Sequence, residues 1–201
     1  MTDTEQTRSY RMSKRREDVE QTRRRITEAA VELHGTVGPS ETTFSSVAEK
    51  AGVQRSTVYR HFPDEEALFG ACTSHWLAGH PWPRADDWKS EVDPAGRLRK
   101  GLRDLYRYYE VNRDMIFNSL RDIVVMPAFV GELMKAQIDE YHTVLLEAWP
   151  EQADGMLAAA VGHAIDFRSW QSLADLGLSP REAADLMSAM VGCMGARPIT
   201  A

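Results

Sequence analysis

Long apolar runs are missing from this 201-residue chain, and none approaches the roughly 18–20 residues that a membrane-spanning helix needs. Cysteine is scarce. Cys72 and Cys193 lie far apart, which favours reduced, buried thiols over a disulfide framework or a redox sensor. The first 18 residues are polar and charged without an apolar core, so we expect no signal peptide. These absences favour a cytoplasmic protein whose length suits two domains.

Sequence signatures of enzymes are also missing. The chain has no glycine-rich phosphate loop, no H-E-x-x-H and no G-x-S-x-G. None of its six histidines is spaced from Cys, Asp or Glu in a strong metal-ligand pattern. We therefore expect no catalytic residues, no metal and no cofactor. Alternating strand patterns are lacking as well, so the fold is predicted to be all-α.

Positive charge is in short supply overall, because the net charge is −6, yet the charges are unevenly distributed. Residues 1–62 hold 11 Lys and Arg against 9 Asp and Glu, whereas residues 63–201 hold 13 against 21. Basic residues gather in residues 8–16 and 23–25. Local basic surface is sufficient for phosphate attraction, and the acidic body disfavours a nonspecific DNA-packaging protein.

The most informative segment is residues 42–62, TTFSSVAEKAGVQRSTVYRHF. Its pattern predicts a helix, a tight turn at Gly52 and a second short helix anchored inward by Val58. Around Val58, many hydrogen-bond donors point elsewhere, as in a recognition helix that lies in a DNA major groove. The alternative for the motif alone is a polar helical hairpin on the surface.

The flanking sequence favours a complete DNA-binding domain. An apolar face at helical spacing precedes the motif, with Ile26, Ala29, Ala30 and Leu33. After the motif, Asp64 is a suitable N-cap for another helix that has acidic residues in its first turn.

The run RRRITEAAVELHGTVGPSETTFSSVAEKAGVQRSTVYRHFPDEEALF resembles the amino-terminal domain of the TetR/AcrR family of bacterial transcriptional regulators, over about residues 18–78. The resemblance implies a dimeric, repressor-like protein that binds a palindromic DNA operator and whose carboxy-terminal domain binds a small effector. Two positions depart from the family pattern. Gln54 replaces a common capping serine, and Glu65 replaces a lysine that touches a DNA phosphate.

The predicted domains are a flexible basic arm (1–17), a helix-turn-helix DNA-binding domain (18–78) and a helical effector-binding and dimerisation domain (79–201). The arm is either a solvated tail or a segment that gains contacts to the DNA backbone or minor groove. Arg55, Ser56 and Ser45 are expected to reach base edges, and other members of the set to bind phosphates. The candidate DNA-binding residues are Thr43, Ser45, Gln54, Arg55, Ser56, Thr57, Tyr59, Arg60 and His61.

In the body, a loop is predicted over residues 79–93, followed by helices over 94–111, 114–125, 127–149 and 151–176 and a last helix that starts after Ser179. Aromatic and methionine side chains suit a flat or apolar organic effector, although core packing is the alternative for each of them. The candidate pocket residues are Trp76, Trp82, Tyr106, Tyr109, Phe117, Arg121, Met126, Phe129, Met134 and Tyr141. Arg121 in particular needs a partner, such as Asp122 or an anionic ligand.

The last two predicted helices carry small residues and methionines, which suit a four-helix bundle formed between two protomers. Ordinary intramolecular core is the alternative. The candidate interface residues are Met156, Ala160, His163, Phe167, Trp170, Ala183, Met187 and Met190.

Overall fold

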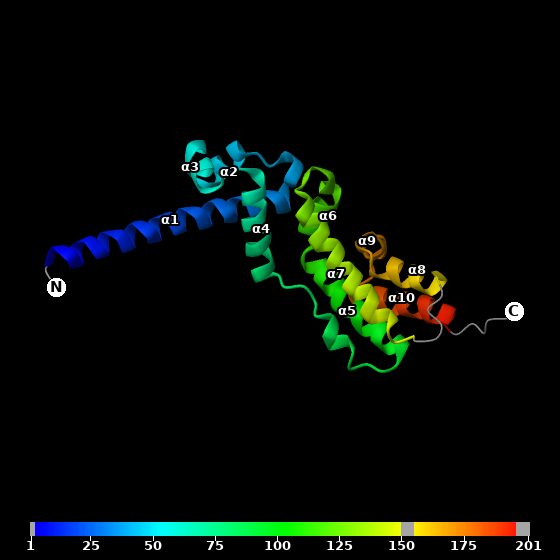
Figure 1. Ribbon diagram of the computed structural model, residues 1–201. Coiled ribbons are helices and arrows are strands. Elements are labelled where there is room, and N and C mark those ends of the chain that lie inside the picture. Colours follow the sequence, from blue (N-terminus) through cyan, green and yellow to red (C-terminus); the bar gives the residue numbers. More distant parts are fainter. Residues whose placement is uncertain (1–2, 150–154, 196–201) are drawn as a thin grey trace. The chain divides into compact units, whose positions relative to one another are not determined.

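A computed structural model describes residues 3–149 and 155–195, and all regular structure within these ranges is helical, with no strand (Figure 1). The all-α prediction is confirmed. The α-helices are α1 (Asp3–Thr36), α2 (Phe44–Ala51), α3 (Arg55–His61), α4 (Glu65–Gly79), α5 (Pro94–Val111), α6 (Arg113–Arg121), α7 (Ala128–Leu146), α8 (Gly155–Ile165), α9 (Phe167–Asp175) and α10 (Pro180–Gly195). Short 3₁₀ turns are η1 (Pro39–Glu41), η2 (Ala85–Trp88) and η3 (Ile123–Val125).

The chain divides into two compact units. The amino-terminal unit comprises the chain up to His80 together with Phe117–Pro127, and the carboxy-terminal unit comprises Pro81–Ile116 and the chain from Ala128. The sequence placed the domain boundary at residue 78 and assigned everything after it to the body. The structure instead returns one later segment, residues 117–127, to the amino-terminal unit.

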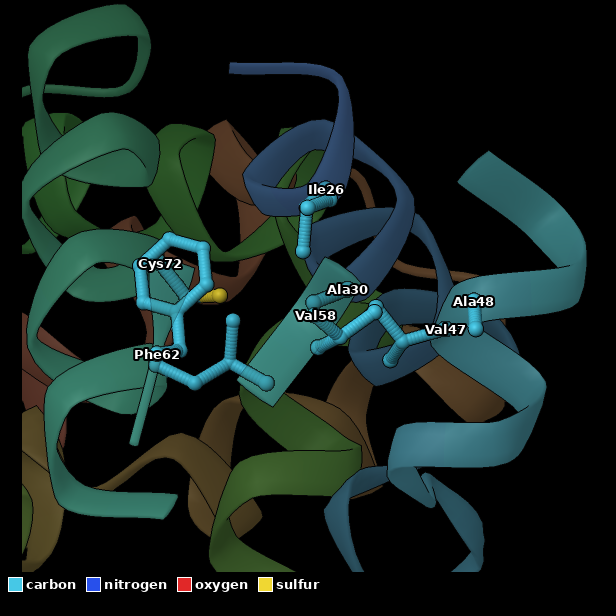
Figure 2. Packing of buried hydrophobic residues seen from close by; sticks show 8 residues of the cluster. Ile26, Ala30, Val47, Ala48, Val58, Phe62 and Cys72 are labelled. Carbon is cyan, nitrogen blue, oxygen red and sulfur yellow. The ribbon is translucent and has the colours of Figure 1, made fainter. Parts of the chain in front are cut away.

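The core of the amino-terminal unit is formed by the face of α1 that the apolar spacing predicted, together with residues from α2, α3 and α4 (Figure 2). Cys72 lies in this core, where burial raises the pKa of its thiol to about 12 and keeps it protonated. The prediction of a buried thiol is therefore confirmed for Cys72 and wrong for Cys193, which is exposed. The core residues are Ile26, Ala30, Val47, Ala48, Val58, Phe62, Leu68 and Cys72.

The basic segment at the start of the chain is helical in the structure, whereas the sequence had suggested a flexible arm. From Asp3 onward it forms the first turns of α1. Residues 1–34 contain neither glycine nor proline, and they are rich in Glu, Gln, Arg and Lys, which favour helix. Local pairs support it further: Ser13 donates a hydrogen bond to Glu17 at 3.2 Å, and Arg24 lies 3.6 Å from Glu28.

In the carboxy-terminal unit, the predicted single helix over 151–176 is wrong. Within its described part, α8 ends at Ile165 and α9 starts at Phe167. The cause is Asp166, whose side chain accepts hydrogen bonds from the backbone N–H groups of Arg168 at 2.7 Å and Ser169 at 3.3 Å. Such an N-cap starts a new helix with a changed direction. Residues 151–154 lie outside the described residues.

The predicted loop over residues 79–93 is partly ordered as η2, whose Trp88 is fully buried and donates a hydrogen bond to Asp104 at 3.0 Å. The start of the last helix is as predicted. Ser179 and Glu182 form a reciprocal cap, and Pro180 occupies the first helical position. Among the described helices, none is both long and apolar enough to cross a membrane.

Candidate nucleic-acid interface

The first helix of the motif, α2, starts and stops where its sequence requires. The Thr43 hydroxyl accepts a hydrogen bond from the Ser46 backbone N–H at 3.1 Å, and the Ser46 hydroxyl accepts one from the Thr43 backbone N–H at 2.9 Å. This reciprocal cap satisfies two donors that the helix itself leaves free. At the other end, Gly52 adopts the left-handed conformation with a φ of 64°, which a side chain would disfavour.

The second helix, α3, is only seven residues long and is held to the core by one buried side chain, Val58. Gln54 is its N-cap, and the Gln54 side chain makes no capping hydrogen bond, in agreement with the expected weak cap. Among the nine candidate DNA-binding residues, Thr57 and His61 are half-buried and the other seven are exposed. The exposed ones are Thr43, Ser45, Gln54, Arg55, Ser56, Tyr59 and Arg60.

Two exposed residues on α3 interact with each other in the DNA-free protein. Arg55 donates a hydrogen bond from Nη2 to the Tyr59 hydroxyl at 3.1 Å, and its guanidinium carbon lies 5.4 Å from the centre of the Tyr59 ring. The Tyr59 ring in turn lies 4.7 Å from the ring of Phe44 on α2. The guanidinium fork is thus held on the exposed side of α3 and is free to exchange Tyr59 for another acceptor, since the pair is exposed.

The carboxy end of α3 is fixed by a residue that sequence reasoning did not assign to the site. Arg23 of α1 donates a hydrogen bond from Nη1 to the His61 carbonyl at 2.7 Å, and its guanidinium lies 4.2 Å from the Phe62 ring. Partial burial, with the nearby charges of Arg60 and Arg23, lowers the pKa of His61 below its usual value. The only sequence signal for this contact was the basic cluster at 23–25, which does not reveal its partner.

Glu65, the position that departs from the family pattern, lies in the first turn of α4, beside the N-cap Asp64. Asp64 and Glu65 line a groove of about 560 Å³ together with Thr43, Arg55 and Tyr59. A carboxylate here faces the same space as the candidate phosphate-binding hydroxyls and repels a DNA strand that enters it.

Segment 117–127 holds the end of α1 by hydrogen bonds. The Asn118 side-chain amide donates to the carbonyls of His34 at 3.1 Å and Gly35 at 3.0 Å, which lie in the last turn of α1. Arg121 donates from Nη2 to the Val37 carbonyl at 2.9 Å. Carbonyls that a helix end leaves without partners are thus satisfied by side chains more than 80 residues later.

The buried Asp122 side chain completes this contact. It accepts hydrogen bonds from the Ser40 backbone N–H at 3.0 Å and the Ser40 hydroxyl at 2.9 Å, and from Arg121 Nε at 2.8 Å. Hydrogen bonds from Arg121, followed by those from Ser40, hold the pKa of Asp122 far below its usual range. Gly38 has a φ of 100°, and a Cβ there would lie only 2.0 Å from Arg121 Nη2. The sequence had interpreted Gly38 only as a helix stop.

The candidate effector residues are divided between the two units. Arg121 is paired with Asp122, as one of the sequence alternatives anticipated. In the carboxy-terminal unit, the hydroxyls of Tyr106, Tyr109 and Tyr141 donate to backbone carbonyls of Ala164, Ile165 and Pro83 at 2.6–2.9 Å. The amino-terminal unit contains Trp76, Phe117, Arg121 and Met126, and the other unit contains Trp82, Tyr106, Tyr109, Phe129, Met134 and Tyr141.

The candidate dimer residues also fall into two groups. Met156 and Met190 are 62% and 56% exposed, His163 is exposed and Ala160 is half-buried. The remaining four, Phe167, Trp170, Ala183 and Met187, are buried within the protomer. The break at Asp166 explains this difference for α9, because it brings the rings of Phe167 and Trp170 to 5.3 Å and 5.7 Å from that of Tyr109.

Comparison with known proteins agrees with this geometry. The family "Bacterial regulatory proteins, tetR family" matches residues 26–72, which run from the core face of α1 to Cys72 of α4. The HTH-type transcriptional regulator TtgR of Pseudomonas putida is 35% identical over 92 residues, 45% of this chain and 44% of TtgR. The tetracycline repressor protein class A from transposon 1721 of Escherichia coli is 39% identical over 69 residues, 32% of each chain. The chain thus spans less than half the length of these curated relatives.

Solved structures share the fold over most of the chain. A TetR-like transcriptional regulator from Rhodococcus sp. RHA1 has a TM-score of 0.62 at 20% identity and covers 88% of this chain and 97% of its own. NalD, the secondary repressor of the MexAB-OprM multidrug efflux pump in Pseudomonas aeruginosa, has a TM-score of 0.57 at 20% identity and covers 88% and 96%. With its helix-turn-helix domain matched in sequence and its fold in structure, the chain belongs to the TetR family of bacterial regulatory proteins.

Proposed function

We propose that the protein is a sequence-specific DNA-binding transcriptional regulator, acting in the cytoplasm as a ligand-responsive, homodimeric repressor. The observation that carries this proposal is the design of α3. A single buried residue, Val58, anchors a short helix whose other side presents Arg55, Ser56 and Tyr59 to solvent. This is how a recognition helix offers donors to base edges and phosphates in a major groove.

Two copies are needed, because a seven-residue helix reads only a few base pairs. Exposed apolar side chains on α8 and α10 offer a surface for the partner, and the buried residues beneath them support it. Met156, Leu186 and Met190 are 62%, 43% and 56% exposed. Such a dimer would bind a palindromic operator whose half-sites lie about 34–36 Å apart.

The effector is proposed to be a small apolar or aromatic molecule that binds the carboxy-terminal unit. Its binding must favour a state in which the two recognition helices no longer match successive major grooves. One covalent route is α6, which starts in the carboxy-terminal unit and ends in the amino-terminal unit. An effector that displaces α6 would pull Asn118 and Asp122 away from the end of α1. The other route is α4, which begins beside α3 and leads to the start of the carboxy-terminal unit.

The test is fluorescence anisotropy of the purified protein with labelled DNA from upstream of its own coding region and with a scrambled duplex of equal length. We expect at least a hundredfold tighter binding to the upstream DNA, within the usual range of specific over nonspecific affinity of about 10³–10⁷ or just below it. Equal affinity for both duplexes would support a nonspecific DNA-packaging protein instead.

Oligomeric state and effector response are measured on the same sample. Equilibrium sedimentation at micromolar concentration should give a dimer, and a monomer would contradict the proposal. Compounds that raise the melting temperature are then added to the DNA complex. We expect some of them to lower operator affinity by about five- to 150-fold, which corresponds to the usual allosteric coupling of ~1–3 kcal/mol. If every stabilising compound leaves DNA affinity unchanged, the protein is not an effector-controlled switch.

A further inference from the structure

The amino-terminal part of α1 is a helix that has little to pack against. At 34 residues, α1 is about 51 Å long. Its fully buried residues begin at Ile26, whereas residues 12–20 are all exposed. Figure 1 shows these first turns continuing as a straight helix past the part of α1 that lies beside α2 and α4. This exposed part, Asp3–Glu20, is called the helical extension below.

The helical extension leaves the unit beside the carboxy end of the recognition helix. Arg23 lies just after it in the sequence and donates to the His61 carbonyl, the last residue of α3, while stacking over Phe62. Arg15 precedes Arg23 by eight residues, or about 12 Å along the helix axis. A recognition helix in a major groove has phosphate strands at both of its ends. The helical extension therefore starts close to the backbone that borders the groove.

The charges of the helical extension have a favourable phase. Residues 6–16 hold five Lys and Arg and no acidic residue. Arg15 precedes Ile26 by 11 residues, about three full helical turns, so its position shares the face of α1 that packs on the domain. Position 8 precedes Ile26 by five turns and falls on the same face. In contrast, Glu17 and Glu20 fall on the other side, where Ser13 binds Glu17.

We propose that the helical extension is a rigid rod that contacts DNA phosphates flanking each half-site, with Arg15 on the DNA-facing side. The inference rests on the proposed DNA-binding function and adds a second contact surface to it. It replaces a flexible charged tail with an element whose helical phase matters. A disordered tail of the same composition would also attract DNA, yet it would be insensitive to rotation about the helix axis.

The first experiment compares two operator duplexes, one that ends at the half-sites and one extended by about ten base pairs on each side. Anisotropy titrations of the full-length protein between 50 and 200 mM salt give the slope of log affinity against log salt on each duplex. Arg15→Gln should lower the slope on the extended duplex by about one for each protomer. The affinity gained from the extension should fall about three- to fourfold for each lost contact over this range.

The matched control is Arg24→Gln. Arg24 is exposed and lies on the opposite face of α1 from Ile26, where it pairs with Glu28. It removes the same charge a similar distance from the recognition helix, and it should leave the benefit of the extended duplex unchanged. If Arg15→Gln and Arg24→Gln lower the slope equally, the effect is general charge and the proposal is overturned.

The second experiment changes the phase and leaves the charges intact. One alanine inserted between Asp18 and Val19 rotates the helical extension by about 100°, whereas four alanines rotate it by a full turn plus about 40°. The single insertion should abolish most of the gain on the extended duplex, and the fourfold insertion should retain most of it. Equal gain in both variants would indicate a flexible tail and overturn the rigid rod.

These outcomes are distinguishable from failure of the proposed function. The short duplex reports the recognition helix alone, so all variants should bind it as the wild type does, with the same preference over a scrambled duplex. If the wild type shows no such preference, the proposed function fails. If the preference is present but the extended duplex adds nothing, only the helical extension is misassigned. Circular dichroism melting checks that each variant is folded.

Discussion

Removal of the Asp122 carboxylate is the perturbation that most sharply tests how segment 117–127 supports the DNA-binding domain. The side chain is only 6% exposed and receives hydrogen bonds from Ser40 N–H and Oγ and from Arg121 Nε. In Asp122→Ala, both Ser40 donors and the Arg121 guanidinium lose their acceptor.

The expected loss follows from these contacts. A hydrogen bond to a charged group contributes about 1.5–3 kcal/mol to stability. Ser40 is exposed and its freed groups regain some water, so the two Ser40 bonds together are taken at the lower end. The Arg121 ion pair is half-exposed and adds at most about 1 kcal/mol. Asp122→Ala should therefore destabilise the amino-terminal unit by about 2–4 kcal/mol, and Asp122→Asn, which keeps an acceptor, by about half as much.

Urea denaturation is followed by circular dichroism, and hydrogen exchange of the amides in α2 and α3 reports the amino-terminal unit separately, because the two units need not unfold together. Asp139→Ala is the matched control, since Asp139 is exposed and pairs only with Lys135 on α7. Its loss should cost about 0.3–0.5 kcal/mol. If Asp122→Ala costs no more than Asp139→Ala, the segment does not support the domain as described.

Two further predictions concern the interface and its pH dependence. Glu65→Lys should raise affinity for all DNA sequences and steepen the salt slope by about one for each protomer, because it adds a phosphate contact in the groove beside Arg55; an unchanged slope in salt titrations would place Glu65 outside the interface. Burial lowers the pKa of His34 from 6.5 to about 4, so the unfolded chain binds more protons between these values, and stability is complete above pH 6.5 and lost as the pH falls toward 4. The part due to His34 should reach about 2 kcal/mol at pH 5 in urea denaturation. It should disappear in His34→Gln, and an unchanged pH profile in that variant would contradict the assignment.

Local sequence signals predicted the helix-turn-helix well. The Gly52 turn, the Val58 anchor, the weak cap at Gln54 and the Asp64 cap all follow from short-range rules that depend on neighbours in sequence. The apolar face of α1 was likewise readable from its spacing, because a 3.6-residue period marks the side that packs.

Features that depend on distant partners were not readable. Asn118 and Asp122 fall in a short amphipathic stretch, and nothing in their own spacing indicates the end of α1 more than 80 residues earlier. The helix break at Asp166 was missed because small apolar residues continue on both sides of it, although an Asp followed by Phe-Arg-Ser is an acceptable N-cap. The helical state of the first residues was missed because charge was weighed above helix propensity.

The central claim, that α3 reads bases, is tested most directly by Arg55→Ala. Anisotropy titrations at one fixed salt concentration measure wild type and variant on the operator and on duplexes with each guanine in the half-site replaced in turn. The guanidinium of Arg55 is exposed near the amino end of α3 and is suited to a bidentate contact with guanine. We expect the variant to lose about 1–3 kcal/mol on the operator and to become indifferent to one guanine in each half-site, while its affinity for a scrambled duplex falls far less. If Arg55→Ala retains both the affinity and the base preference of the wild type, α3 is not the reading element.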